Sequence, residues 1–203
     1  MLNRRSARTR PAPATSRIGW WDTVVGPGAS PLENAGTVTS AIAGTVLAPR
    51  LARGAGPEGV WPRLVLRLLA ADLWGGAWCN NTAAAARWYG RHERRARHHF
   101  AFAVAHVHPF VVARLDPQPR WDRALAQYVY LLGATAVLGR VDRRAQRALA
   151  ILTTVGGMAL DRWWGVSSAA PWFGPVYYVK LLAGHAGGAA ALHPDPLSTT
   201  ARA

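Results

Sequence analysis

Residues 62–82 read PRLVLRLLAADLWGGAWCNNT, and this stretch decides the fold class that the sequence predicts. Apolar side chains fill most of it; Arg63 lies at its start, and Arg67 and Asp72 lie inside it. A helix of about 20 mainly apolar residues is long enough to cross the hydrocarbon core of a bilayer. The stretch therefore predicts a transmembrane helix that carries charge at membrane depth.

Five further stretches have the same apolar character, and they cover residues 31–48, 98–115, 121–138, 148–160 and 171–192. The first begins with Ser30, Pro31 and Glu33, the residues that favour a helix N-terminus. We therefore predict an all-α fold, a polytopic transmembrane bundle of about six helices. Four or five helices remain alternatives, because residues 31–48 and 148–160 are short for a bilayer.

The distribution of arginines predicts the regions of the chain and the side of the membrane on which its N-terminus lies. Residues 1–29 predict a disordered basic tail, residues 30–192 a transmembrane helical domain, and residues 193–203 a disordered C-terminal tail. Arginines are more numerous in alternate connections between the apolar stretches, and cytoplasmic loops of membrane proteins carry such an excess. This pattern predicts a multi-pass protein of the inner (plasma) membrane with a cytoplasmic N-terminus.

Asp72 is the first candidate for function, because an acid at membrane depth is costly and is usually functional. Asp72, Gly76 and Asn80 are four residues apart and so share one helix face. Gly75 and Gly76 would let another helix or a ligand approach that face closely. The alternative is a structural ion pair of Asp72 with Arg67 or Lys180 that holds helices together.

Histidines supply further candidates. His99 and His106 are seven residues apart and lie on nearly the same helix face, whereas His108 is expected to point elsewhere. His185, in the last apolar stretch, could meet them beside Asp72. Imidazole and carboxylate groups suit zinc, iron, copper or haem iron. The alternative is hydrogen bonding between helices.

The candidate metal ligands are therefore Asp72, His99, His106 and His185, and the candidate catalytic residues are Asp72, His99, His106 and Lys180. The cofactor expected at this site is a metal ion or haem. Lys180 has two simpler interpretations, since it could extend to a membrane interface or serve as the counter-ion of Asp72. Cys79 is the only cysteine, which excludes an intramolecular disulfide.

Two sets of small residues predict close helix packing. Gly36, Ser40 and Gly44 repeat every four residues, and Gly184 is followed by Gly188 at the same spacing. Small residues at this spacing let helix backbones approach one another in membranes. They could serve packing within the chain, a homo-oligomer or a membrane partner.

A loose resemblance covers most of residues 36–192. The pattern Asp-x-x-Gly-Gly at residues 72–76, Trp-Tyr at residues 88–89 and His-x-His-Pro at residues 106–109 resembles small multi-spanning bacterial membrane proteins of unknown function. The resemblance implies a membrane location and no particular activity.

Three functional interpretations follow. The first is an integral membrane protein, in contact with the lipid bilayer, whose polar Asp/His site binds a metal, haem or a small polar ligand. The second is a small permease or accessory membrane subunit without chemistry. The third is a soluble basic helical module that binds nucleic acid, as the net charge of +14 could suggest. The arginines cluster between apolar stretches, which favours the membrane and makes nucleic acid an unexpected partner.

Overall fold

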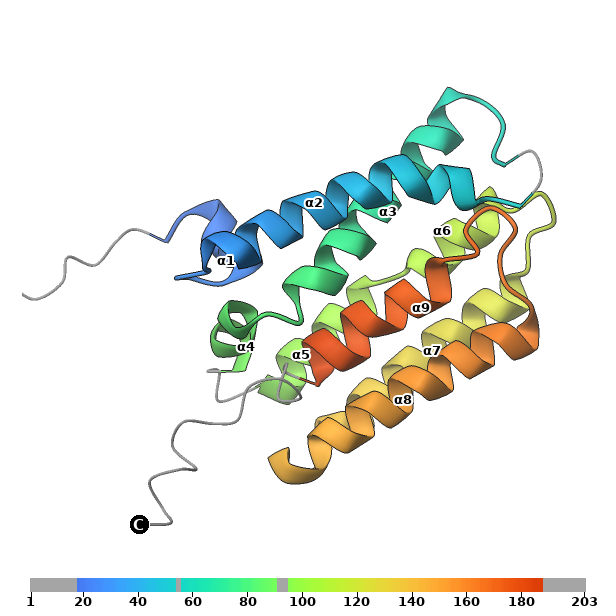
Figure 1. Cartoon of the computed structure of the whole chain (residues 1–203). Helices are drawn as coiled ribbons and strands as arrows, with labels where there is room; N and C mark the ends of the chain where they lie inside the picture. Colours follow the sequence, from blue (N-terminus) through green and yellow to red (C-terminus); the bar gives the residue numbers. More distant parts are fainter. Residues whose placement is uncertain (1–17, 54–55, 91–94, 188–203) are drawn as a thin grey trace, which may run out of the picture.

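The computed structural model describes residues 18–53, 56–90 and 95–187, and these residues form helices and connections without a strand (Figure 1). The predicted all-α class is confirmed. No helix among the described residues has both the length and the mean hydropathy that a bilayer crossing requires.

The helical elements follow one another along the chain with short connections. They are α1 (Trp20–Val25), α2 (Pro31–Leu47), η1 (Ala48–Leu51, a 3-10 helix), α3 (Val60–Cys79), α4 (Ala83–Gly90), α5 (Arg95–Ala105), α6 (His108–Leu115), α7 (Trp121–Leu138), α8 (Arg143–Trp164), α9 (Phe173–Tyr178) and η2 (Val179–Ala186, a π-helix). Helices α2 and α7 agree with the predicted ranges to within one residue.

Helix α2 begins as its sequence predicts. The Ser30 hydroxyl accepts a hydrogen bond from the Glu33 backbone N–H at 3.2 Å, and the Glu33 carboxylate accepts one from the Ser30 N–H at 2.7 Å. This reciprocal pair satisfies two backbone donors that the first helical turn leaves without partners. The other Glu33 oxygen accepts from the Ala84 N–H at 3.0 Å, which connects α2 to the start of α4.

Glycines bring α2 and α3 into close contact. A Cβ atom on Gly36 would overlap the indole of Trp78, and one on Gly44 would lie 2.6 Å from the Ala70 carbonyl oxygen. The predicted close packing at Gly36 and Gly44 is confirmed. The second predicted pair, Gly184 with Gly188, ends outside the described residues.

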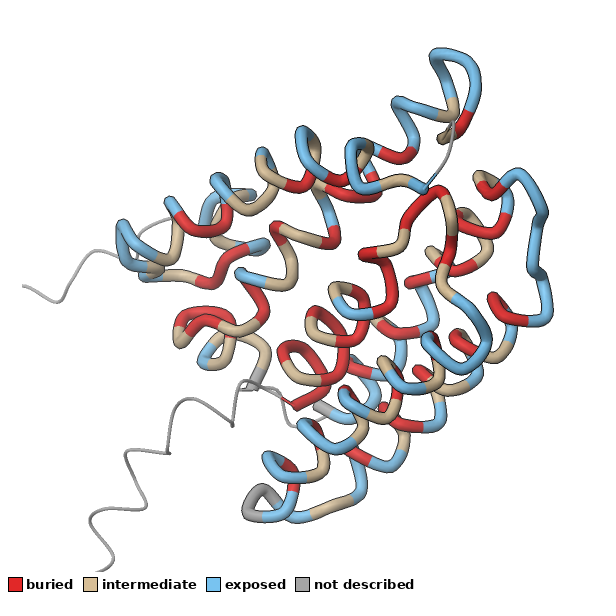
Figure 2. The backbone as a smooth tube through the Cα atoms, turned by 45° about the vertical axis from the view of Figure 1, so that its right-hand side comes forward, coloured by how far each residue is buried: buried red, intermediate tan, exposed pale blue. Residues whose placement is uncertain are grey.

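The last helical segment, α9 followed directly by η2, lies in the middle of the bundle (Figures 1 and 2). Segment η2 contacts α3, α5, α7 and α8, and α9 contacts α3 and α8. Phe173, Tyr177 and Leu182 are almost completely buried there, against Leu73 of α3 and Leu131 of α7. Side chains of this central element therefore face every neighbouring helix.

The structure corrects several predicted boundaries. Residues 98–115 are not one helix, because the chain leaves helical geometry at His106 and Val107. Pro109 explains the break, since a proline ring in a continuous helix would clash with the carbonyl four residues earlier, at Ala105. Residues 171–192 likewise form the α-helix α9 followed by the π-helix η2.

The predicted disordered tail, residues 1–29, is too long, because residues 20–25 form α1. Helix α8 extends beyond the predicted residues 148–160 at both ends, and α4 lies where no helix was predicted. Residues 1–17 and the tail at 193–203 lie outside the described part of the chain.

Candidate functional site

Three side chains from two neighbouring parts of the bundle meet at the break between α5 and α6. Asp72 belongs to α3, His106 lies in the break, and His108 is the first residue of α6. One ligand atom from each of the three lies within 4.8 Å of the others. Two imidazoles and one carboxylate form a ligand set that zinc and iron use in proteins.

His106 has the orientation of a metal ligand. Its Nδ1 atom lies 2.6 Å from the carbonyl oxygen of Phe102 in α5. A carbonyl oxygen only accepts, so Nδ1 carries the hydrogen and the neutral ring presents a lone pair at Nε2. Histidines that bind metals usually donate their other N–H to a carbonyl or carboxylate in this way, which fixes the ring.

His108 completes the group, so the prediction that it points away from the other candidates is wrong. Its Nε2 atom lies 3.3 Å from Oδ2 of Asp72, and its ring lies 4.9 Å from that of His106 between centroids. The prediction assumed one continuous helix, whereas the break redirects the chain. Nδ1 of His108 is buried and has no hydrogen-bond partner among the described residues.

Lys180 of η2 is the counter-ion of Asp72. Its Nζ atom donates to Oδ2 of Asp72 at 2.6 Å, which confirms the ion pair predicted as one of the alternatives. The Lys180 side chain is 4% exposed, whereas that of Asp72 is 50% exposed. The carboxylate is therefore accessible from outside the bundle, while the ammonium group is inside. Arg67, the other proposed partner, is exposed.

Gly76 provides the space for Lys180. A Cβ atom on Gly76 would lie 2.5 Å from Cε of Lys180, so the lysine reaches Asp72 across the glycine surface. The other glycine of the pair, Gly75, packs on α2, where a Cβ atom would lie 3.0 Å from Cβ of Ala41. The close approach predicted for both glycines is confirmed.

We expect Gly76→Ala to displace Lys180 from Asp72 and to lower the free energy of unfolding by about 1–3 kcal/mol, as added volume in a packed site does. Gly133→Ala in α7 is the matched control, because a Cβ atom there meets nothing within 4 Å. The control should be neutral or more stable by up to about 1 kcal/mol. Thermal unfolding of both purified variants measures the difference, and equal stability would show that Lys180 needs no glycine beneath it.

His99 and His185 form a second pair that does not belong to the group of three. Their ring centroids lie 4.5 Å apart, and the His185 ring stacks on Phe102 at 3.8 Å. Phe102 also contacts the His106 ring, at 4.2 Å. The structure thus brings Asp72 and His106 together, whereas His99 and His185 are not part of the group of three. Direct contact of their rings leaves no room for a porphyrin between them, so the arrangement suits a single ion better than haem.

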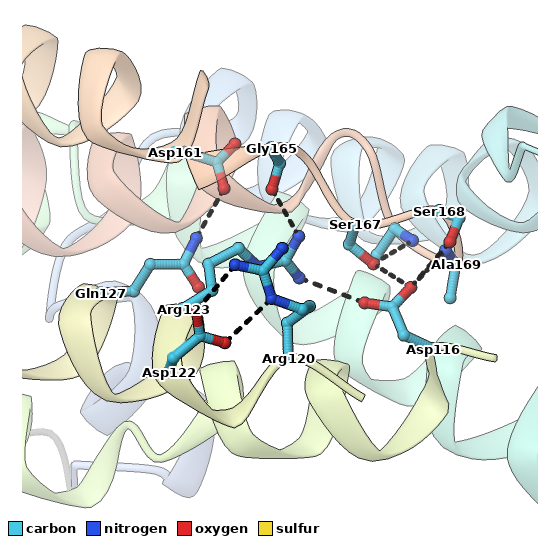
Figure 3. Close-up of polar contacts among 11 residues, drawn as sticks. Asp116, Arg120, Asp122, Arg123, Gln127, Asp161, Gly165, Ser167, Ser168 and Ala169 are labelled. Atoms are coloured by element: carbon cyan, nitrogen blue, oxygen red, sulfur yellow. Dashed lines mark hydrogen bonds and ion pairs between the residues drawn. The ribbon is translucent and has the colours of Figure 1, made fainter. Parts of the chain in front are cut away.

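A second buried polar network, which sequence reasoning missed, lies where α6 ends (Figure 3). Oδ1 of Asp116 accepts hydrogen bonds from the Ser167 hydroxyl at 2.8 Å, the Ser168 hydroxyl at 3.2 Å and the Ala169 N–H at 2.9 Å. Its Oδ2 accepts from Nη2 of Arg123 at 3.2 Å. Arg123 also donates to the Gly165 carbonyl at 2.8 Å. The network joins the α6–α7 region to the connection between α8 and α9.

Asp161 continues this network into the bundle. Its Oδ1 atom accepts from Nε2 of Gln127 at 2.6 Å, and a Cβ atom on Gly174 would overlap its carboxylate. The three residues come from α7, α8 and α9. Because its members bond mainly to one another, this network fits a structural role.

Comparisons of the chain with protein-family models, with curated proteins and with solved structures give no match.

Proposed function

We propose that the chain is an integral protein of the inner (plasma) membrane that binds one divalent transition-metal ion through Asp72, His106 and His108. The observation that carries the proposal is the convergence of three ligand atoms within 4.8 Å, with the His106 ring already held by a backbone carbonyl. Three protein ligands leave a coordination position for water or a substrate, as catalytic zinc and non-haem iron sites do. The half-exposed Asp72 gives a route to that position.

The outer surface supports the membrane location. Leucine, isoleucine and valine side chains are exposed along several helices, among them Ile42, Leu68, Val129, Leu152 and Val155. Figure 2 shows that the exposed residues lie on the outer sides of the helices and the buried ones toward the middle. Soluble monomers rarely expose large contiguous apolar patches. Ionisable side chains in membrane bundles almost always face the interior, and the buried Asp116, Arg123 and Lys180 fit this pattern.

The helix break between α5 and α6 also supports the membrane location. Membrane proteins place non-helical backbone at membrane depth only where protein or a cavity surrounds it, and transporters place ligand sites at such breaks. Here the Tyr177 hydroxyl donates to the His106 carbonyl at 2.9 Å, which satisfies a backbone group that the break releases. Two of the three proposed metal ligands are His106 in this break and His108 directly after it.

Lys180 is compatible with a bound ion. A carboxylate has two oxygens with about four acceptor positions, so Asp72 can bind an ion and still accept from Lys180. In this arrangement Lys180 acts as the partner that orients the ligating carboxylate.

Elemental analysis of protein purified from the membrane fraction tests the proposal. We expect about one zinc or iron ion per chain. Loss of an outer-shell partner weakens metal binding by about 10–100-fold, and Asp72→Asn or His106→Gln should weaken it by more than that. His98→Gln is the matched control, because His98 is exposed and lies outside the group of three. Metal content that is equal in all variants, or absent after reconstitution with zinc or iron, would contradict the site.

One observation favours a second candidate, a proton path in a small permease. Lys180 and His108 both contact the same oxygen of Asp72, so a proton could pass between a buried and a half-exposed group. Proteoliposomes with an internal pH-sensitive dye test this function. Proton flux that Asp72→Asn abolishes in metal-free protein would support it, and flux equal to that of empty vesicles would exclude it.

A further inference from the structure

A groove lies between α5 and α7, separate from the Asp72 group. It has a volume of about 460 Å³, and its lining is mainly apolar, with Phe100, Ala101 and Ala136 among the lining residues. Two arginines, Arg97 and Arg140, also line it. The volume is within the range of small-molecule sites, which combine an apolar lining with a few polar groups.

The two arginines lie at the same end of the groove because α5 and α7 approach closely there. A Cβ atom on Gly139 would lie 3.0 Å from Cβ of Ala96, the residue before Arg97. Arg140 donates to the Ala136 carbonyl at 3.0 Å, which holds its guanidinium beside the groove. A guanidinium has five N–H donors, so this bond leaves others for a ligand. Both arginines are exposed.

The lining of the groove includes one further polar residue. Thr135 lines it and is 3% exposed, yet its Oγ1 atom has no hydrogen-bond partner among the described residues. Because this atom is itself buried, it lies beneath the lining and adds no polar contact for a ligand, so the two arginines are the polar groups that a ligand would meet.

We propose that the groove binds an anionic phospholipid, with one acyl chain along its apolar lining and the phosphate between Arg97 and Arg140. Arginine is well suited to this role because its planar group binds phosphate oxygens through two parallel hydrogen bonds. The paired positive charges select an anionic headgroup over a zwitterionic one. The proposal shares the bilayer setting of the proposed function but none of its metal ligands.

Native mass spectrometry of the detergent-solubilised full chain, titrated with phosphatidylglycerol or phosphatidylcholine, tests this site. We expect one phosphatidylglycerol to bind in preference to phosphatidylcholine. Because each arginine near an anionic surface contributes about 1 kcal/mol, Arg97→Gln with Arg140→Gln should weaken binding by about 30-fold. Arg114→Gln with Arg162→Gln, two exposed arginines at other helix ends, is the matched control and should bind as the unaltered protein does.

A second variant separates the acyl chain from the headgroup. Ala136→Leu fills the apolar lining without a change of charge, so it should weaken phosphatidylglycerol binding, and inorganic phosphate should not compete with the lipid. Equal binding of both lipids, or equal loss in the two arginine pairs, would overturn the proposal. Unchanged binding in Ala136→Leu would overturn it as well. Asp72→Asn should leave lipid binding unaltered, so failure here and failure of the metal site are distinguishable.

Discussion

Replacing Asp116 with leucine should lower the free energy of unfolding by about 3–5 kcal/mol, because the change leaves the Arg123 guanidinium buried without its carboxylate. The side chains of Arg123 and Asp116 are only 3% and 4% exposed. The same change removes the acceptor of Ser167, Ser168 and the Ala169 N–H, so several buried donors lose their partner together. Thermal or denaturant unfolding of the purified protein measures the loss.

The adjacent pair Arg120 and Asp122 is the matched control. Arg120 donates to both oxygens of Asp122, at 2.9 and 2.7 Å, and these bonds raise the pKa of the Arg120 guanidinium. This pair is exposed, and ion pairs in water contribute little to stability, so Asp122→Asn should change unfolding hardly at all.

The double variant Asp116→Leu with Arg123→Met should recover much of the lost stability, because it removes both charges of the buried pair. If Asp116→Leu cost no more than Asp122→Asn, the buried network would not stabilise the junction between α6 and the α8–α9 connection.

Gly44→Leu should have the second largest effect on stability, about 3 kcal/mol, at the upper end for an overpacked core position. A Cβ atom at this position would lie 2.6 Å from the Ala70 carbonyl oxygen and 2.8 Å from Cβ of Trp74. The first of these is a backbone atom of α3 that cannot move aside alone, so α2 must separate from α3. Thermal unfolding measures the loss.

Gly133→Leu is the control for this change, since Gly133 also lies within a helix and has open space around it. Leucine forms helix more readily than glycine, so the control should be at least as stable as the unaltered protein. A Gly44→Leu protein of unaltered stability would mean that α2 is not held against α3 in solution.

Much of the helical pattern could be predicted from local signals. The Ser30 cap and the following Pro31 located the start of α2, and a mainly apolar stretch located α7. Asp72 stood out because it is an acid in an apolar stretch, and Lys180 was one of the two partners predicted for it. The glycines of α2 and α3 showed where helices approach, because their small size matters only in close contact.

The rest of the site depends on long-range geometry that local signals do not contain. Pro109 was a visible sign of a helix break, but the direction of the chain after the break, and so the position of His108, depends on packing against α3 and α9. Asp116 and Arg123 lie near helix ends, where polar residues are usually solvated. Their burial follows from the position of the α8–α9 connection, which the sequence does not specify.

The π-helical geometry of η2 lets two side chains that are five residues apart both lie in the interior. Gly187 donates to the Leu182 carbonyl at 2.8 Å, a bond that spans five residues instead of four. Lys180 and His185 are also five residues apart and both are buried. In an α-helix five residues cover about 1.4 turns, so the two side chains would face different directions. Deleting one residue between them, with a return to α-helical geometry, would place them four residues apart and so on one face again. The π-helix thus accommodates one extra residue of chain while both side chains stay inside.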